Sequence, residues 1–469
     1  MHTTLSFEDL LQQEIGSRSL VIEHHALSQE IIPLSILRYV PGNRLVLRAK
    51  WQNNIIAVKL FFHRYKKYWH WQRECHGLQR LQEADIKTPM IVYKGTNHTK
   101  TAYLIATTYI ENAHHFDDML PPPDTTLPFL KAHIAIMVKL HKKNYVQHDW
   151  HVNNFLYTPD FIYAIDAGQI KPLRWQKNKV RFNNLALFLS NLPDGYQLFY
   201  RALYDAYCKD FSLPGSLSYA FVLQCIAAHK KRRLEKLQTK VFRASTLTLY
   251  KKTFFMRLLR TIKTRTPEWS DVLAHPNKLF TPEAIYLKKG NSSTVIKCSI
   301  DNKDYVIKRY NIKNAWHAVL RFIQPTRAAV NWRFSHVLNA LSIPTPEPYA
   351  MVEHRFGCLR RTSFFISLWQ AGVPLETYLP YATPAQQQLI AQQVITIFNQ
   401  LREAQIIHGD TKASNWLVHN DKVYLLDLDG MTYYKTPVFF MRARQKELSR
   451  FLKNWNDEKI RHLFSDLIS

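Results

Sequence analysis

Asp and Asn residues that could bind metal ions and move protons recur at one fixed spacing in this chain. Asp149 precedes Asn154 by five residues and Asp166 by seventeen. The later half repeats this set at the same spacing with Asp410, Asn415 and Asp427. Phosphoryl transfer from a nucleotide needs such groups, because oxygen ligands hold Mg²⁺ on the phosphates and a carboxylate takes the acceptor hydroxyl's proton. The two sets are therefore candidates for that chemistry.

A lysine on a strand-like segment lies upstream of each set. Lys59 stands in IIAVKLF and Lys308 in DYVIKRY, where β-branched neighbours favour strands. A lysine so placed could neutralise nucleotide phosphates. An isolated Asp-x4-Asn pattern is more often a turn or a helix cap. Two ordered copies, each behind a lysine, favour kinase-like modules over chance.

The elements that must position these residues also recur. Each lysine strand is followed by a helical segment that ends in similar words, LQEADIKTP (81–89) and LNALSIPTP (338–346). A longer helical pattern then precedes each paired set, and short β-rich runs lie within the set. The residues expected on the core face of these long helices are Leu130, Ile134, Met137, Val138 and His141, and then Leu389, Ile390, Val394, Ile397, Phe398 and Leu401.

A break in the pattern near 265–275, at Pro267 and Pro276, predicts two domains, residues 1–268 and 269–469. A chain of 469 residues also exceeds the ~250–300 residues at which single cores stop growing. The stretch 230–265 before the break holds 13 Lys or Arg residues and one acid. Its apolar residues recur at helical spacing, so we expect a basic amphipathic helix that either binds anionic lipid or substrate or is simply solvated.

The formal net charge of +27 implies an anionic partner such as a membrane surface, nucleic acid or a phosphorylated substrate, or else a basic solvated surface. The five cysteines are scattered and odd in number, which favours a reducing compartment. The acidic residues in MHTTLSFEDLLQQEIG make a signal peptide unexpected. No run of 18 apolar residues occurs, so membrane attachment is expected to be peripheral if it occurs.

The motif words resemble those of the protein-kinase-like superfamily, and within it the lipopolysaccharide core kinases, which phosphorylate Kdo or heptose. The words are HGDTKASNWL with LLDLDG in the later half, and HDWHVNNFLY with AIDAGQI in the earlier half. The resemblance covers most of both halves. It implies an α+β fold of two tandem protein-kinase-like bilobal modules, each with a β-rich N-lobe and an α-helical C-lobe.

In the first module the resemblance implies that Lys59 binds phosphate and that Glu74 pairs with it from the following helix. Asp149 is implied as the catalytic base. Asn154 and Asp166 are implied as Mg²⁺ ligands. The family's His two residues before the catalytic Asp is replaced here by glutamine, at position 147, which concerns the local loop geometry.

In the second module the resemblance implies Lys308 as the phosphate-binding lysine, Asp410 as the base, and Asn415 and Asp427 as metal ligands. The position of the helix glutamate is taken by Asn331, which cannot form the ion pair. Either the lysine is positioned differently in this branch, or the second module is weakened or regulatory.

The nucleotide phosphates would need a covering loop, and neither half has a three-glycine loop. Gly42 in RYVPGNRLVL and Gly290 in KKGNSSTVIK are the candidates. A single glycine before a strand can equally be an ordinary turn.

The resemblance implies an ATP- and Mg²⁺-dependent phosphotransferase acting on a sugar hydroxyl of the lipopolysaccharide inner core. Its substrate would be a lipopolysaccharide core or lipid A precursor. It would lie in the cytoplasm, with the anionic face of the inner membrane as a further partner and nucleic acid as a less favoured one. The alternatives are a protein or other small-molecule kinase, and a kinase-fold scaffold with one inactive module. The sequence does not indicate an oligomeric state.

Overall fold

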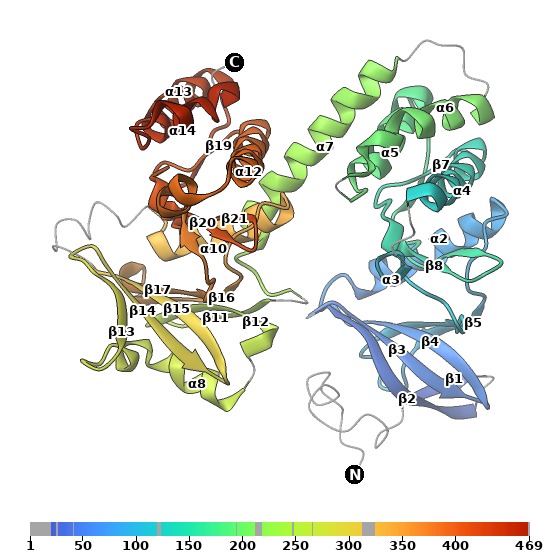
Figure 1. Ribbon diagram of the computed structural model, residues 1–469. Coiled ribbons are helices and arrows are strands. Elements are labelled where there is room, and N and C mark those ends of the chain that lie inside the picture. The colour runs from blue at the N-terminus through green and yellow to red at the C-terminus, as the bar shows by residue number, and fades with distance from the viewer. Residues whose placement is uncertain are drawn as a thin grey trace. The chain divides into compact units, whose positions relative to one another are not determined.

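A computed structural model of the chain describes residues 20–24, 27–40, 42–119, 123–193, 195–211, 218–245, 248–264, 266–311 and 324–467 (Figure 1). These residues form two compact units that divide between Lys230 and Lys231. The N-terminal residues 1–16, for which no signal peptide is expected, lie outside the described residues. None of the helices in the described part has the length and apolar character needed to cross a bilayer.

The first unit begins with an antiparallel six-stranded sheet in the order β1-β2-β3-β4-β6-β5. Its strands are β1 Leu20–His24, β2 Leu27–Val40, β3 Arg44–Trp51, β4 Asn54–Phe61, β5 Ile91–Thr96 and β6 Tyr103–Thr108. Helix α2, Lys67–Glu83, connects β4 to β5.

Mostly helical structure follows this sheet in the first unit (Figure 1). The helices are α3 Phe116–Met119, α4 Pro123–Lys142, α5 Lys177–Ser190 and α6 Tyr200–Phe211, with the short helices η1 Val152–Asn154 and η2 Tyr196–Phe199. Two small two-stranded sheets lie between them, one formed by β7 Tyr145–Gln147 with β10 Ile170–Pro172 and one by β8 Phe155–Tyr157 with β9 Ile162–Ala164. Helix α7, Tyr219–Lys240, begins in the first unit and ends in the second, because the units divide within it. The core face expected for α4 is confirmed, because Leu130, Ile134 and Met137 are buried.

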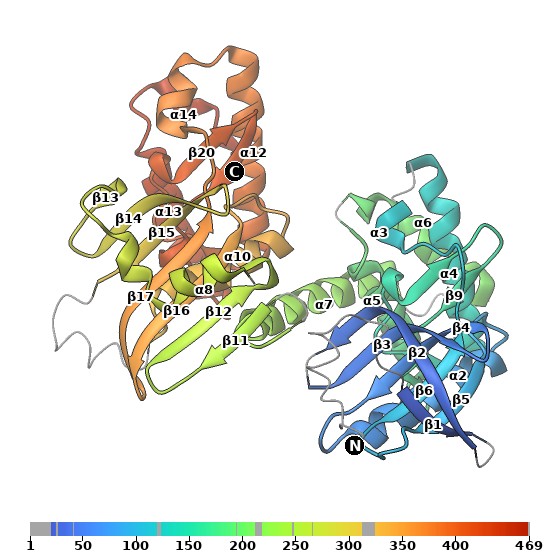
Figure 2. The ribbon, with the colours of Figure 1, turned by 90° about the horizontal axis from the view of Figure 1, so that it is seen from below.

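The second unit contains an antiparallel seven-stranded sheet in the order β11-β12-β16-β17-β15-β14-β13 (Figure 2). Its strands are β11 Thr248–Lys252, β12 Met256–Thr261, β13 Ile285–Lys289, β14 Ser293–Ile300, β15 Lys303–Tyr310, β16 Pro348–Phe356 and β17 Leu359–Leu368. Helix α8, Pro267–Ala274, and helix α10, Arg327–Ala340, pack with this sheet, since Trp269 and Trp332 belong to its two core clusters.

Helices again dominate the end of the second unit. They are α11 Leu375–Tyr378, α12 Pro384–Glu403, α13 Pro437–Leu452 and α14 Glu458–His462, with the short helices η5 Leu379–Tyr381, η6 Ala413–Asn415, η7 Leu428–Gly430 and η8 Ser465–Leu467. The short helices η3 Ile262–Thr264 and η4 Pro276–Leu279 lie earlier, between β12 and β13. The short strands are β18 Val373–Pro374, β19 Ile406–Ile407, β20 Trp416–His419, β21 Lys422–Leu425 and β22 Thr432–Tyr433. The expected core face of α12 holds except at Leu389, which is 48% exposed. Both units are thus mixed α and β, as expected.

The two units divide earlier in the chain than the predicted boundary at residues 268 and 269. Strand β12 pairs with β16, so the hairpin β11–β12 is part of the second unit's sheet. The prolines near 265–275 instead frame α8, where Pro267 occupies the first turn behind the Thr266 cap.

The prediction of a basic helix over 230–265 is wrong beyond Lys240, where α7 ends and the hairpin β11–β12 follows. Leu258 and Leu259 are both buried, and they belong to different core clusters on the two faces of the sheet. A strand covered on both faces has a continuous apolar run, which periodicity alone does not separate from a buried helix.

Strand alternation directs both predicted lysines to one face of their sheets. In β4, Ile56, Val58 and Leu60 are buried in the cluster on one face, and Lys59 lies between them on the other. Lys59 pairs with Val46 across β3–β4, as Lys308 pairs with Val295 across β14–β15. The two lysines therefore occupy matching places in the two sheets.

The repeated words after the first helices have a shared structural role. Thr88 Oγ1 donates to the carbonyl of Ala164 at 2.8 Å, and Thr345 Oγ1 donates to the carbonyl of Leu425 at 2.8 Å. Each contact fixes the segment after the helix to the strand that leads into the second Asp of the set.

Helix α2 approaches the segment after Asp166 very closely at Gly77. A Cβ atom at Gly77 would lie 1.9 Å from the Ala167 carbonyl oxygen, a backbone atom that cannot move aside alone. We therefore expect Gly77→Ala to loosen this contact and to destabilise the first unit by about 1–3 kcal/mol, the usual cost of overpacking. Faster hydrogen exchange of the α2 amides would report it. His76→Ala, at the exposed neighbouring position, is the control and should leave exchange unchanged.

Candidate active site

The Lys59 ammonium of the first unit binds two groups on different elements. Lys59 Nζ donates to Glu74 Oε1 on α2 at 2.5 Å and to the Ile165 carbonyl at 2.5 Å. The Glu74 side chain is 2% exposed, so the ion pair is largely shielded from water. The predicted contact of Lys59 with Glu74 is thus present, and it joins β4, α2 and the residue before Asp166.

Asp166 is held by a residue that the sequence did not single out. Arg44 Nη2 on β3 lies 3.2 Å from Asp166 Oδ2. Burial raises the pKa of Asp166, but the positive charges of Lys59 and Arg44 outweigh it and hold this pKa below its usual value. Asp166 is therefore an ionised, mostly buried carboxylate, which is the form that a metal ion binds.

The loop of Asp149 and Asn154 is closed by a hydrogen bond between its ends. Asn154 Nδ2 donates to the Asp149 carbonyl at 2.7 Å, so its amide oxygen is the atom that could ligate a metal. The exposed Asp149 side chain is open to a substrate hydroxyl. Gln147, at the position where the family has His, donates to the Asp166 carbonyl at 2.7 Å, so it links this loop to the segment that contains Asp166.

A cavity of about 200 Å³ brings Arg44, Glu74, Asp149 and Asp166 to one place in the first unit. Asn43, next to Gly42, also lines it, and its side chain contacts His70 Nδ1 at 2.9 Å. The turn that contains Gly42 thus lies at this cavity, as a phosphate-covering loop would require.

The second unit holds its lysine differently. Lys308 Nζ donates to Asp427 Oδ1 and lies 2.9 Å from Asp429 Oδ2. Arg327, on the first turn of α10, binds Asp429 at 2.9 Å. Helix α10 therefore reaches the acidic segment through an arginine, and Lys308 is paired without a helix glutamate.

Asn331 lies where the helix glutamate was expected, and it has another partner. Its side-chain amide donates to the Tyr310 hydroxyl, and both residues are buried. Lys308 and Arg327 approach the face of the Tyr310 ring at 5.3 and 5.0 Å. The asparagine therefore belongs to a separate polar contact beneath the charged network.

Burial raises the pKa of Asp429, but Lys308 and Arg327 more than offset it and keep this pKa below its usual value. Asp427 has a left-handed backbone conformation, with φ of 54° and ψ of 59°. Such backbone is uncommon outside glycine and often marks functional positions. It starts the tight turn that brings Asp427 and Asp429 to the same lysine.

The second catalytic-loop candidate repeats the first. Asn415 Nδ2 donates to the Asp410 carbonyl at 2.8 Å and lies 3.3 Å from Asp410 Oδ2. Lys412 Nζ lies 3.7 Å from the same carboxylate oxygen. His408 Nε2 donates to the Leu426 carbonyl at 2.9 Å while its Nδ1 accepts from the Asp410 amide, and burial lowers the His408 pKa, which suits a neutral ring.

Glu447 on α13 binds the backbone of the loop that contains Asp410. Its Oε1 accepts the backbone N–H groups of His408 at 2.7 Å and Gly409 at 2.9 Å. Burial raises the Glu447 pKa to about 7 despite these bonds. In the first unit Asn184 has a comparable place, because its Nδ2 donates to the Gln147 carbonyl at 2.6 Å.

Gly290 lies between β13 and β14, and its N–H donates to the Ser293 carbonyl at 3.1 Å. The turn therefore stands at the start of the strand that pairs with the lysine strand β15, as Gly42 stands before β3. No contact from Gly290 to Asp410 or Asp427 is found within the described part of the second unit, so its covering role stays a prediction.

Sequence reasoning missed Arg44, Arg327, Lys412 and Asp429. Asp429 had a visible signal, the second Asp of LLDLDG, and Lys412 stands two residues after Asp410. Arg44 and Arg327 had none, because an arginine at a strand or helix start is an ordinary surface residue until the fold is known.

Oxygen ligands suitable for Mg²⁺ are present in each unit as one Asp carboxylate and one Asn amide. Within the described residues no group of three or more His, Cys, Asp or Glu side chains could hold a metal by itself. A site of this kind fits a metal that also binds substrate phosphates, because Mg²⁺ is commonly held by one or two carboxylates plus phosphate oxygens.

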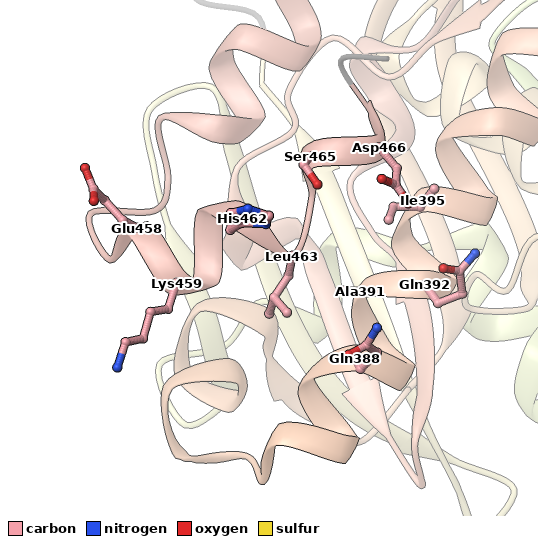
Figure 3. Close-up of a pocket in the computed structure, with 10 residues that line it drawn as sticks. All are labelled: Gln388, Ala391, Gln392, Ile395, Glu458, Lys459, His462, Leu463, Ser465 and Asp466. Carbon is pink, nitrogen blue, oxygen red and sulfur yellow. The ribbon is translucent and has the colours of Figure 1, made fainter.

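A separate hollow of about 590 Å³ lies between α12 and the segment α14–η8 (Figure 3). Gln388 and Gln392 face it from α12, and Leu463 faces it from the C-terminal segment. None of the predicted site residues lines it, so it does not belong to the candidate active site.

Comparison with known proteins singles out the second unit. Residues 287–464 match the sequence model of the family described as "Lipopolysaccharide kinase (Kdo/WaaP) family". This segment contains Lys308, Asp410, Asn415 and Asp427. No curated protein sequence matches the chain significantly.

Among solved structures, one titled "WaaP in complex with acyl carrier protein" shares 17% identity at a TM-score of 0.30, over 43% of this chain and 88% of that chain. A WbdD crystal structure shares 15% identity at a TM-score of 0.31, over 45% of this chain and 53% of that one. A co-crystal structure of WbdD and the kinase inhibitor LY294002 shares 14% identity at a TM-score of 0.30, over 45% and 48%. The chain thus spans about half the length of the WbdD chains.

Asp429→Asn tests the charge network of the second unit. The change leaves the half-buried Arg327 without its ion-pair partner and removes one of the two carboxylates at Lys308. We expect a loss of about 1–3 kcal/mol, because breaking a shielded ion pair leaves a charge uncompensated. Hydrogen exchange of the α10 amides should accelerate accordingly. Asp271→Asn, which loses only an exposed 3.9 Å ion pair with Lys278, should leave the exchange of the α10 amides unchanged. Equal exchange in both variants would show that Asp429 does not stabilise Lys308 and Arg327.

Glu447→Gln tests the buried carboxyl beneath the catalytic loop. The pKa of Glu447 in the folded protein, about 7, exceeds the usual 4.5, so the folded state binds the proton of this carboxyl more tightly than the unfolded state does. Proton binding therefore makes its full contribution to stability below pH 4.5, and this contribution is lost as the pH rises through about 7. The wild-type free energy of unfolding, relative to Glu447→Gln, should therefore fall by up to about 3 kcal/mol over that window.

Pulse proteolysis in urea at several pH values, with peptide mapping of the second unit, would measure this difference. Glu376→Gln alters an exposed carboxylate and serves as the control. A wild-type minus Glu447→Gln difference that stays flat between pH 4.5 and 7 would show that Glu447 ionises normally.

Proposed function

We propose that this chain transfers phosphate from ATP to a sugar hydroxyl of the lipopolysaccharide inner core, because residues 287–464 match the model of the lipopolysaccharide kinase (Kdo/WaaP) family. The acceptor would be a lipopolysaccharide core or lipid A precursor. The observation that carries the proposal lies inside the matching segment: Lys308 binds Asp427, Asn415 binds Asp410, and the Leu426 amide, next to Asp427, donates to the Asn415 carbonyl at 2.8 Å.

Asp410 is the proposed general base. Its carboxylate is partly exposed, and Asn415 and Lys412 lie beside it, so it can be oriented while it accepts the proton of the sugar hydroxyl. Lys308 is the proposed phosphate-binding cation. It is held by carboxylates until a nucleotide offers it phosphate oxygens.

Asn415 and Asp427 are the proposed ligands of Mg²⁺. When bound, this ion would neutralise negative charge on the phosphate groups of ATP. The amide oxygen of Asn415 and the carboxylate of Asp427 are hard oxygen ligands of the kind that this ion prefers.

We propose the first unit as a second kinase module of the same kind, so that the chain is a tandem of two modules. Lys59, Glu74, Asp149, Asn154 and Asp166 would perform the matching roles. The support is the equal spacing of the motif, the Lys59–Glu74 pair and the cavity lined by Glu74, Asp149 and Asp166. Two modules could serve two hydroxyls or two sugars.

The proposal also includes a cytoplasmic location with peripheral attachment to the anionic face of the inner membrane. The net charge of +27 suits such a surface, and the lipid-linked acceptor would be found there.

Asp149→Ala, Asp410→Ala and the double variant test the chemistry. We expect core phosphate to be lost in cells with at least one single variant. The reason is that removing a general base should slow phosphate transfer by about 100-fold or more. Mass spectrometry of core oligosaccharide measures it. Asp421→Ala, which changes an Asp outside the site, should keep core phosphate at the wild-type level.

The double variant decides between the proposal and its rivals. Unchanged core phosphate in Asp149→Ala/Asp410→Ala would remove the sugar-kinase claim. Label transferred from ATP to protein Ser or Thr, with none on core oligosaccharide, would instead favour a protein kinase. Activity lost with Asp410→Ala but not with Asp149→Ala would make the first unit a scaffold.

A further inference from the structure

Three phenylalanines lie together and exposed at the turns of two neighbouring hairpins of the second unit. Phe254 and Phe255 form the turn of β11–β12, and Phe356 lies at the turn of β16–β17. Their exposed fractions are 54%, 65% and 52%. Figure 2 shows both turns projecting from the same end of the sheet. Such a contiguous apolar group at a turn usually marks a binding surface.

Backbone hydrogen bonds join the two turns into one tip. The Arg355 amide donates to the Phe255 carbonyl at 2.7 Å, and the Gly357 amide donates to the Phe254 carbonyl at 2.9 Å. Gly357 has a φ of +61°, and a Cβ atom there would meet the Phe254 ring at 3.1 Å. The glycine at position 357 therefore leaves room for the Phe254 ring, and the backbone bonds hold the three phenylalanines in place.

The rings pack on each other rather than lying apart. The centroids of Phe254 and Phe255 are 5.1 Å apart, and those of Phe254 and Phe356 are 5.0 Å apart, both edge to face. This arrangement presents one apolar knob. A nucleic acid would instead need open, separately accessible ring faces for base stacking.

Cationic side chains flank this cluster of three phenylalanines on the strands of the same two hairpins. They are Lys251, Lys252, Arg355, Arg360 and Arg361. The one acid within 248–261 and 348–368 is Glu353, which is 1% exposed and is bound by Arg257 and Thr326. The tip therefore combines exposed aromatic rings with uncompensated positive charge.

Strand register places the tip at the same end of the sheet as the Gly290 turn. Tyr310, two residues after Lys308, pairs with Ser293 on one side and with Ser363 on the other. Strand β17 continues from Ser363 to Leu359, about 13 Å at 3.3 Å per residue, before the turn. The tip and the Gly290 turn thus extend toward the same end.

We propose that Phe254, Phe255 and Phe356 form a membrane-docking tip that inserts into the headgroup region of an anionic bilayer while the neighbouring lysines and arginines bind lipid phosphates. Aromatic rings suit the boundary between headgroups and acyl chains, and cationic residues gain attraction from an anionic leaflet. The role of the tip, to hold the active site over a lipid-linked acceptor, rests on the proposed function.

Vesicle co-sedimentation of the full chain without ATP tests the tip directly. Wild type should bind vesicles that contain phosphatidylglycerol and should bind pure phosphatidylcholine vesicles at least about tenfold more weakly. Phe254→Ser/Phe255→Ser/Phe356→Ser should lower binding to the anionic vesicles by about tenfold or more. The control Tyr381→Ser/Leu389→Ser removes exposed apolar side chains elsewhere in the unit and should bind like wild type.

Lys251→Gln/Lys252→Gln gives a second measurement that leaves the aromatic packing intact. It should weaken binding to phosphatidylglycerol vesicles and make the remaining binding less sensitive to salt. Wild-type binding by the serine variant, equal binding to both kinds of vesicle, or binding of wild type only to an acidic protein would each overturn the proposal.

Phosphate transfer separates this inference from the proposed function. The serine variant should transfer phosphate to a soluble, deacylated acceptor at the wild-type rate and lose activity only on an acceptor embedded in anionic vesicles. Absence of transfer by wild type to either acceptor would refute the kinase function alone, since vesicle binding is measured without ATP. Equal loss on both acceptors would mean that the substitutions disturb the active site, which would overturn a docking role.

Discussion

A lysine ammonium held between a sheet and an acidic loop is the interaction on which each unit depends. A shielded ammonium is costly unless a carboxylate compensates it. Lys59 meets this requirement with Glu74, and Lys308 meets it with Asp427 and Asp429. Strand, helix and loop must approach each other for these contacts to form. The charge requirement therefore brings the candidate metal ligands close to the lysine strand.

The two units meet the same requirement with different residues. In the first, the helix supplies the carboxylate to Lys59, and Arg44 from the sheet neutralises Asp166. In the second, the loop supplies both carboxylates, and the helix supplies Arg327. The charges are thus exchanged between helix and loop. The lack of a glutamate at position 331 therefore does not leave Lys308 unpaired.

Much of the fold and the candidate site could be predicted because local patterns determine them. Alternation in IIAVKLF places Lys59 on one face, and the equal spacing of the paired Asp residues indicated two similar loops. That Asp427 and Asp429 together replace the helix glutamate as partners of Lys308 could not be predicted from Asn331 alone, since an asparagine there shows only which contact is missing. The segment 248–261 was misread because β12 is covered on both faces, which gives a helix-like run of apolar residues.

The close contact between Gly77 and the Ala167 carbonyl also restricts how the first unit can move. With no side chain between them, helix and acidic loop touch backbone to backbone, and Glu74 ties the same helix to Lys59. An outward swing of α2 would have to drag the loop along or break both contacts at once. Helix α2 and the loop should therefore move together as one rigid body. The Lys59–Glu74 pair and the geometry of the candidate metal site would then form or break in one step.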